Sequence, residues 1–284
     1  MNRGTTGLQA LLAGPDMLVA PFVCDGLQAK IAEAAGFQAV YMTGFGTAAV
    51  RGYPDLGLLT MSEMVDSVRT IAMAVRVPVI CDADTGYGNP LNVIRTVREY
   101  EDAGAAALHI EDQTWPKRCG FLAGKHVIPL NEMAAKIRAA CDARRGTQLL
   151  IIARTDALQP HGWDDAEHRA RAYRDAGADL IFVDGIMTVD DLDTYARRLG
   201  DLPLVYNGQL LPVPEVAQRG FRIMIHPATL AAAYTALRDA MTELKATGAV
   251  RAATDPTAFA EIIRLLGVPA ALETAQQYDA EARH

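Results

Sequence analysis

One pattern recurs along the 284 residues of the chain: a helical segment ends at a glycine, and an apolar run follows within a few residues. The glycines and the runs after them are Gly36 with 39–43, Gly104 with 107–111, Gly177 with 180–184 and Gly220 with 223–226. A glycine just past a helix adopts the left-handed backbone that ends the helix, so the chain can turn directly into a strand. The pattern therefore predicts alternating helices and strands.

Further apolar runs bring the number of expected strands to eight. The additional runs are 18–22, 77–81, 149–153 and 204–206. They are continuously apolar rather than alternating, which is typical of parallel strands buried on both faces. Each run precedes a helical pattern, so we predict a (β/α)8 TIM-type barrel of the α/β class. We expect residues 1–284 to form a single barrel domain with a C-terminal helical extension over 254–284.

Composition limits the partners of the chain. Hydrophobic residues make up 50% of it and the net charge is −7, so we expect neither a nucleic-acid nor a membrane surface. An anionic ligand must then be held by local cations, backbone amides or a metal. The 4 cysteines show no CxxC pair and no zinc-ligand spacing, and no signal peptide or membrane span is visible. We therefore expect a reduced, cytoplasmic protein.

Polar residues stand at or just after the C-terminal ends of the predicted strands. They are Thr43, Asp82, Glu111, Arg154, Asp184, Asn207 and His226. In a (β/α)8 barrel these strand ends converge on the face that carries the active site. The sequence therefore predicts one site built from the whole set.

Acidic residues follow two successive predicted strands. Asp82 and Asp84 alternate after one strand, and Glu111 ends the next. Carboxylates that meet at one point repel each other unless a cation lies between them. Mg2+ prefers oxygen ligands and keeps several waters, so we predict that these three carboxylates bind Mg2+ (or Mn2+ in its place), partly through water. The alternative is that Asp84 or Asn89 caps the following helix.

A cysteine lies among cations on a long loop. Cys119 stands between Lys117-Arg118 and Gly120. Neighbouring cations lower the pKa of a thiol, so we expect a reactive cysteine with a depressed pKa. The loop over 113–129 is longer than an ordinary βα connection and predicts a lid over the substrate. The alternative is a surface loop with an incidental cysteine.

Two features predict carboxylate binding. Glycine in Thr43-Gly44-Phe45 lets backbone amides approach an anion. The guanidinium of Arg154 can grip a carboxylate through two parallel hydrogen bonds, although a structural ion pair is the alternative. His226 faces the site if the strand register holds, and a half-buried structural histidine is the alternative.

Five motifs together resemble the isocitrate lyase/phosphoenolpyruvate mutase superfamily over nearly the whole chain. They are Pro54-Asp55-Leu56-Gly57, Asp82-Ala83-Asp84-Thr85-Gly86-Tyr87-Gly88-Asn89, His109-Ile110-Glu111-Asp112-Gln113, Lys117-Arg118-Cys119-Gly120 and Ala153-Arg154-Thr155-Asp156-Ala157. The Lys-Arg-Cys-Gly loop is similar to that of the carbon–carbon lyase branch, which includes 2-methylisocitrate and dimethylmalate lyases and oxaloacetate hydrolases. Carboxyphosphonoenolpyruvate mutase carries a similar loop.

The resemblance implies a Mg2+-dependent barrel, assembled as a homotetramer of paired subunits that swap a terminal helix. It implies retro-aldol cleavage of a small 2-hydroxy or 2-oxo (di)carboxylate. In that chemistry Cys119 protonates the cleaved carbon, Arg154 stabilises developing charge, and Tyr41 or a metal-linked carboxylate is the base; Lys117 completes the catalytic set. The substrate-binding residues implied are Thr43, Gly44, Phe45, Asp55, Gly120, Phe121, Asp184, Asn207 and His226.

The chain departs from the family pattern at four places. Phe121 replaces the histidine usual in the lyase branch, and Asp184 replaces a glutamate. Asn207 is followed by Gly208-Gln209-Leu210-Leu211 instead of a Met and a Glu-Gly-Gly type segment, and His226 replaces a tyrosine. All four belong to the distal half of the expected pocket, so we expect an altered and less polar second portion of the substrate.

Two alternative functions stay open. Phosphonopyruvate-type mutase or hydrolase chemistry would call for more cations in the distal pocket, and Phe121, Gln209 and Leu210 supply none. A non-catalytic metabolite-binding protein would have no need of a thiol acid at Cys119.

Overall fold

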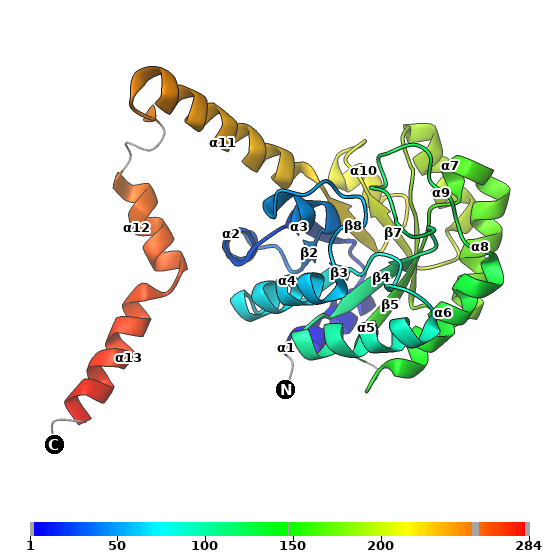
Figure 1. Ribbon diagram of the computed structural model, residues 1–284, viewed down its shortest axis with the longest axis horizontal. Helices are drawn as coiled ribbons and strands as arrows, with labels where there is room; N and C mark the ends of the chain where they lie inside the picture. Colours follow the sequence, from blue (N-terminus) through cyan, green and yellow to red (C-terminus); the bar gives the residue numbers. More distant parts are fainter. Residues whose placement is uncertain (1–2, 147, 252–255, 282–284) are drawn as a thin grey trace. The chain divides into compact units, whose positions relative to one another are not determined.

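Eight parallel strands close into a barrel in the computed structural model, which describes residues 3–146, 148–251 and 256–281 (Figure 1). Each strand pairs with its sequence neighbours, and the last pairs with the first. The strands are β1 Leu18–Val23, β2 Val40–Met42, β3 Val79–Asp82, β4 Ala107–Glu111, β5 Leu150–Thr155, β6 Leu180–Val183, β7 Leu204–Asn207 and β8 Ile223–His226. The predicted (β/α)8 barrel is confirmed.

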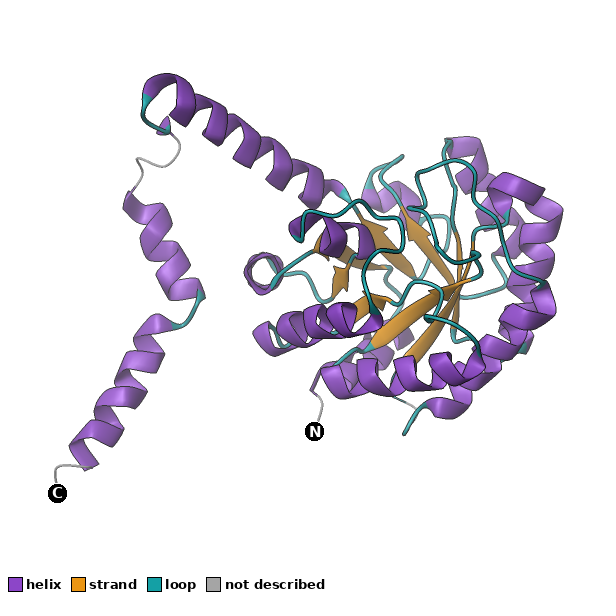
Figure 2. Cartoon of the chain, viewed as in Figure 1, coloured by secondary structure: helices purple, strands orange, loops and turns teal. Residues whose placement is uncertain are grey.

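Helices surround the strands (Figure 2). They are α1 Arg3–Ala13, α2 Gly26–Ala34, α3 Gly44–Val50, α4 Met61–Ala74, α5 Pro90–Ala103, α6 Leu130–Ala143, α7 Leu158–His161, α8 Trp163–Asp175, α9 Val189–Leu199 and α10 Val213–Ala217. Local sequence explains the ends of α5 well. Asn89 caps its N-terminus by accepting from Leu91 N at 2.9 Å, and Gly104 ends it at a φ of 104°. The sequence left open whether Asp84 or Asn89 caps this helix, and in the structure Asn89 does so.

Strand side chains alternate between two apolar layers. In β5, Leu150 and Ile152 pack with the cluster inside the barrel, whereas Ile151 and Ala153 pack between the strands and the helices. Because successive side chains point to opposite faces, Arg154 continues the inward row of Ile152. The same parity applies to Asp82 after Ile80 in β3. This alternation directs polar side chains inward at the C-terminal ends of the strands.

The contact pattern divides the chain into Met1–Leu230 and Ala231–His284. The second unit holds most of α11 Ala228–Thr247, together with α12 Pro256–Leu265 and α13 Val268–Glu281. The start of the predicted extension at residue 254 lies outside the described residues, so its boundary stays a prediction. Among the helices that the structure describes, none is both long and apolar enough to cross a membrane.

Burial in the outer apolar layer predicts the effect of a core truncation. Ile151 is 0% exposed in β5, whereas Leu91 on α5 is 75% exposed. We expect Ile151→Ala to lower the free energy of unfolding by about 2–5 kcal/mol, because it leaves a cavity. Leu91→Ala should change it by less than about 0.5 kcal/mol. Denaturant unfolding measures both, and equal losses would contradict this packing.

Candidate active site

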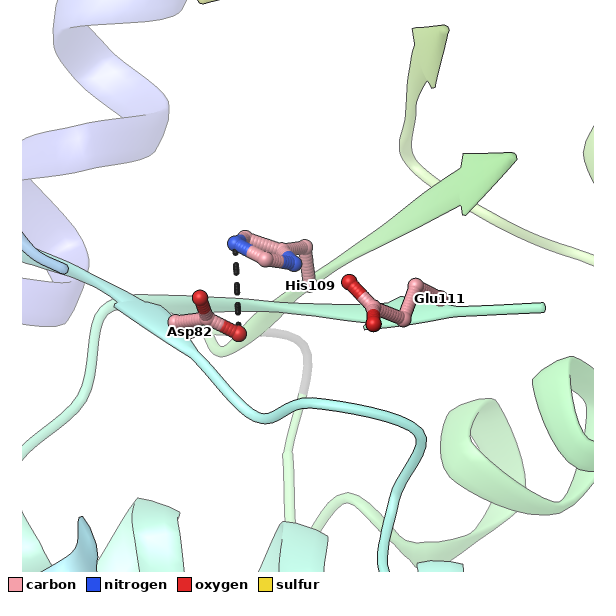
Figure 3. A group of neighbouring side chains, drawn as sticks. All are labelled: Asp82, His109 and Glu111. Carbon is pink, nitrogen blue, oxygen red and sulfur yellow. Dashed lines mark ion pairs between the residues drawn. The ribbon is translucent and has the colours of Figure 1, made fainter. Parts of the chain in front are cut away.

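Three buried side chains meet at the ends of β3 and β4 (Figure 3). They are Asp82, His109 and Glu111, and one potential ligand atom from each lies within 4.8 Å of the others. His109 and Glu111 alternate along β4 and therefore point the same way. His109 was not predicted as a site residue, although its motif was recognised, because an inward histidine on an apolar strand usually indicates core packing.

Asp82 is held ionised by its surroundings. Its Oδ1 accepts from Asp84 N at 2.9 Å and its Oδ2 accepts from Gly44 N at 3.2 Å. Burial acts to raise the pKa of Asp82, but His109, Lys117 and Arg154 lower it overall. Burial lowers the pKa of His109 to about 4, so the ring is neutral near pH 7. The charge that stabilises the Asp82 carboxylate at that pH therefore comes from Lys117 and Arg154.

Glu111 offers an oxygen that the protein leaves unpaired. Its Oε2 lies 3.2 Å from Arg154 Nε, whereas its buried Oε1 has no hydrogen-bond partner among the described residues. Burial raises the pKa of Glu111 well above its ordinary value despite Arg154. A buried carboxylate oxygen without a partner calls for an explanation, and a divalent cation bound beside Asp82 would satisfy it. The donor set therefore fits a metal site.

Asp84 is paired with a lysine instead. Lys117 Nζ lies 2.9 Å from Asp84 Oδ1 and 2.5 Å from Asp55 Oδ1. Burial acts to lower the pKa of Lys117, but Asp84, Asp82 and neighbouring acids raise it well above its ordinary value. Burial raises the pKa of Asp84 to about 6. Asp84 lies outside the group of three potential ligands, so its metal role stays a prediction.

Arg154 joins three carboxylates at the barrel end. Its Nε and Nη2 each lie 2.9 Å from an oxygen of Asp156, and its Nη2 lies 3.3 Å from Asp184 Oδ2. With Glu111 this makes three acidic partners for one buried guanidinium. The bidentate partner is thus Asp156 of the protein itself, which is the structural alternative that the sequence left open. Its contact with a substrate carboxylate stays a prediction.

The Cys119 thiol is buried and neutral. The residue is 7% exposed, and its backbone N donates to Asp55 O at 3.2 Å. Burial raises the pKa of Cys119 to about 11, and Lys117 and Arg154 offset this only in part. The predicted depression of this pKa was wrong, because burial of the thiol outweighs the effect of Lys117, whose ammonium group is paired with Asp55 and Asp84. A neutral thiol is suited to donating a proton.

Tyr41 is a protonated phenol near neutral pH. Its OH lies 2.7 Å from His109 Nε2. Burial, together with Asp82, raises the pKa of Tyr41 well above its ordinary value. This favours a hydrogen-bonding role over that of a base, and the predicted catalytic role stays untested.

The loop between β4 and α6 is anchored by a lysine that the sequence gave no reason to single out. Lys125 Nζ donates to Gly120 O at 2.9 Å, to Asp156 Oδ1 at 2.8 Å and to Asp184 Oδ2 at 2.8 Å. The side chain is 0% exposed. A lysine in a polar loop ordinarily points to solvent, so no pattern distinguished it from Arg118.

A small cavity joins most of the predicted site residues. It is lined by Phe22, Tyr41, Thr43, Phe45, Asp55, Asp82, Lys117, Arg118, Cys119, Gly120, Phe121, Arg154, Asp184 and Asn207. Its volume is about 30 Å³, room for only one or two waters. Among described residues, the lining leaves out Gly44, Asp84, Glu111 and His226. Gly44 N contacts Asp82, and His226 Nδ1 accepts from Ala228 N at 3.4 Å.

Comparison with known proteins identifies the family. The family described as phosphoenolpyruvate phosphomutase matches residues 8–245, and a 2,3-dimethylmalate lyase of Eubacterium barkeri is 40% identical over 279 residues, which is 95% of this chain and 96% of that protein. The chain belongs to the phosphoenolpyruvate mutase/isocitrate lyase superfamily. This confirms the resemblance seen in the sequence.

Other superfamily members are similarly close. A 2-methylisocitrate lyase of Aeropyrum pernix is 43% identical over 252 residues, covering 85% of this chain and 81% of that protein. The structure of an oxaloacetate acetylhydrolase in complex with 3,3-difluorooxalacetate superposes with a TM-score of 0.91 at 38% identity, covering 98% of each chain. A phosphoenolpyruvate phosphomutase from Streptomyces platensis superposes with a TM-score of 0.92 at 31% identity, covering 97% and 99%.

The positions at and beside the departures from the family pattern differ in exposure and in their partners. Phe121 lines the cavity while 58% exposed, and Asp184 is paired with Lys125 and Arg154. Asn207, which the chain shares with the family pattern and which precedes the divergent segment 208–211, has a buried Oδ1 without a hydrogen-bond partner among the described residues. The substrate-binding roles of these residues stay predictions.

The raised pKa of Cys119, about 11, predicts the pH dependence of its alkylation. Only the thiolate reacts with iodoacetamide, and below the pKa its fraction grows about tenfold for each pH unit. The alkylation rate of Cys119 should therefore still be rising between pH 8 and 10, as measured by peptide mass spectrometry. A rate that is already constant at pH 8 would contradict the raised pKa.

Proposed function

We propose that this protein is a divalent-metal-dependent carbon–carbon lyase that cleaves a 2-hydroxy or 2-oxo (di)carboxylate by retro-aldol chemistry. One observation carries the proposal: the neutral thiol of Cys119 and the ionised carboxylate of Asp82 line the same cavity. Arg154 lines that cavity too. A proton donor and an anion-binding centre thus face one small space, which suits the release and protonation of a carbanion. The relatives named as dimethylmalate and methylisocitrate lyases support the same class.

Asp82 and Glu111, with His109 beside them, would hold the metal. Mg2+ fits the two carboxylates, and Mn2+ would also accept the imidazole nitrogen. Such a cation would polarise the 2-oxygen and the adjacent carboxylate of a bound acid. The protein would contribute the Thr43 side chain, which lines the cavity, to that carboxylate, since Gly44 N already donates to Asp82 Oδ2.

For a 2-hydroxy acid the bond changes balance without a further reactant, whereas a 2-oxo acid first adds one water to its carbonyl and supplies a hydroxyl of the resulting geminal diol. A base takes the proton of the substrate hydroxyl, the adjacent carbon–carbon bond breaks, and its electron pair moves into the carboxylate on the leaving fragment. Cys119 then gives its S–H proton to the new carbanion carbon. Because the pKa of Tyr41 is raised, a carboxylate of the cluster is the better base of the two that we predicted. Arg154 stabilises the negative charge that develops.

Phosphorus chemistry is the second candidate, since phosphoenolpyruvate phosphomutase is the family's description. The cations near the cavity are already paired with carboxylates of the protein, which disfavours phosphorus chemistry. Lys117, Lys125 and Arg154 each already contact two or more carboxylates of the protein. A phosphonate would have to compete with these partners.

We further propose that the protein is a cytoplasmic homotetramer in which paired subunits swap a terminal helix. Residues 1–284 of each subunit would form one barrel domain with its helical extension. Apolar side chains on the C-terminal helices support burial against a partner. In the single chain Phe259 is 70% exposed, Leu272 58% and Tyr278 64%. Light scattering should give four times the 30.5 kDa chain mass, and a monomer would contradict the assembly.

An NMR time course tests the activity. The purified protein is incubated with Mg2+, and then with EDTA, against oxaloacetate, 2-methylisocitrate, dimethylmalate, citramalate and phosphonopyruvate. We expect EDTA-sensitive cleavage of a carbon-only acid, because the cluster needs the cation. Turnover of phosphonopyruvate alone would establish the second candidate, and absence of turnover across the panel would contradict both for these substrates.

Two variants separate the roles of thiol and metal. Cys119→Ser should lower kcat by about 100-fold or more, because a hydroxyl is a weaker acid than the thiol. Asp82→Ala should abolish the response of activity to Mg2+. Cys141→Ser on α6 is the matched control, and its turnover should equal that of the native protein. Full turnover by Cys119→Ser would remove the acid assignment.

A further inference from the structure

Lys125 has no part in the proposed chemistry, yet its side chain is 0% exposed. Burying an ammonium group is costly unless its charge and its hydrogen-bond donors are all matched. Burial acts to lower the pKa of Lys125, but Asp184 and Asp156 raise it, so the group is charged. A buried charge of this kind indicates that the conformation of the loop depends on the lysine.

All three donors of the ammonium group are used within the protein. They reach Gly120 O at 2.9 Å, Asp156 Oδ1 at 2.8 Å and Asp184 Oδ2 at 2.8 Å. A lysine ammonium has three N–H bonds, so none is left for a substrate. Lys125 therefore acts on the arrangement of the protein rather than on the reacting atoms.

The three acceptors belong to separate segments. Asp156 directly follows β5, Asp184 directly follows β6, and Gly120 lies in the loop itself next to Cys119. The lysine thus ties the middle of the loop to two strand ends. The fit is close, since a Cβ atom on Gly120 would lie 2.4 Å from Asp184 Oδ2.

The strand-end anchor is itself rigid. Asp156 N donates to Asp112 Oδ1 at 2.9 Å, and both Asp156 oxygens contact Arg154 at 2.9 Å. Asp112 Oδ2 in turn accepts from Thr155 Oγ1 at 2.8 Å and from Tyr173 OH at 2.7 Å. Lys125 therefore grips a carboxylate that cannot follow the loop if the loop moves.

We propose that Lys125 is a positioning residue that latches the cysteine loop onto the ends of β5 and β6 and so holds the Cys119 thiol at the cavity. The identity of Cys119 as the acid rests on the proposed function, whereas the latch is a statement about the loop alone. Removing the lysine leaves the negative charges of Asp184 and Asp156 with less positive charge beside them. It also removes the contact that holds the middle of the loop.

The four cysteines report on the latch without any substrate. Cys24 directly after β1, Cys81 on β3 and Cys119 on the loop are buried, and Cys141 is partly exposed on α6. We expect Lys125→Met to raise the iodoacetamide alkylation rate of Cys119 about tenfold or more at pH 8, because three charge-assisted hydrogen bonds are lost. Cys24 and Cys81 should stay protected, and Cys141 should react as in the native protein. Lys30→Met on α2 is the matched control and should change none of the four rates.

An unchanged Cys119 rate, with Cys24 and Cys81 still protected, would overturn the proposal. Rapid alkylation of every cysteine would mean that Lys125→Met does not fold. Asp184→Asn then decides, because it keeps the shape of the acceptor and removes its charge. The latch predicts the same selective rise at Cys119 in that variant, and no rise would refute it.

Kinetics distinguish positioning from a general structural role. On a substrate that the native protein turns over, Lys125→Met should lower kcat by about 100-fold, since a misplacement of about 1 Å has that effect. The KM should change by less than about threefold, because the lysine makes no substrate contact. A higher KM with unchanged kcat would contradict positioning. If the native protein turns over nothing in the panel, the proposed function fails while the alkylation result still tests the latch.

Discussion

The ion pairs of Arg154 are the interaction on which the rest of the site depends. One buried guanidinium contacts Glu111 from β4, Asp156 after β5 and Asp184 after β6. Three carboxylates so close together would repel each other without it, and a buried charge that loses its partner is strongly destabilising. Asp156 and Asp184 are then free to bind Lys125 as well, which fixes the loop over the cavity. Charge balance at the barrel end thus determines where Cys119 lies.

This arrangement follows from the alternation of side chains along the strands. Inward positions carry Ile80 and Ile152 in the middle of β3 and β5, and Asp82 and Arg154 two residues later. The apolar interior gives the polar ring a rigid base and removes it from water. The same burial raises the pKa of Glu111 and of Cys119, so it prepares both a carboxylate that needs a cation and a thiol that keeps its proton.

The barrel and the strand-end residues were predictable from sequence, because repeating apolar runs and glycines report directly on backbone periodicity. Loop side chains were not. Lys117 precedes Cys119 closely in sequence, but its ammonium group pairs with Asp55 and Asp84, and burial of the thiol raises the pKa of Cys119 instead. The burial of Lys125 could not be predicted either, because its two carboxylate acceptors, Asp156 and Asp184, follow strands that are distant in sequence. Sequence proximity predicts which charges are near one another along the chain, not which ones face one another.

The central claim is that Cys119 delivers the proton to the carbon freed by bond cleavage. Turnover in D2O tests it most directly, with the label located in the product by NMR. The account predicts one deuterium at the cleaved carbon of the carboxylate product in a single stereochemical configuration, and loss of that stereochemical control in Cys119→Ala. Product with no deuterium at that carbon, or the same single configuration without the thiol, would contradict it.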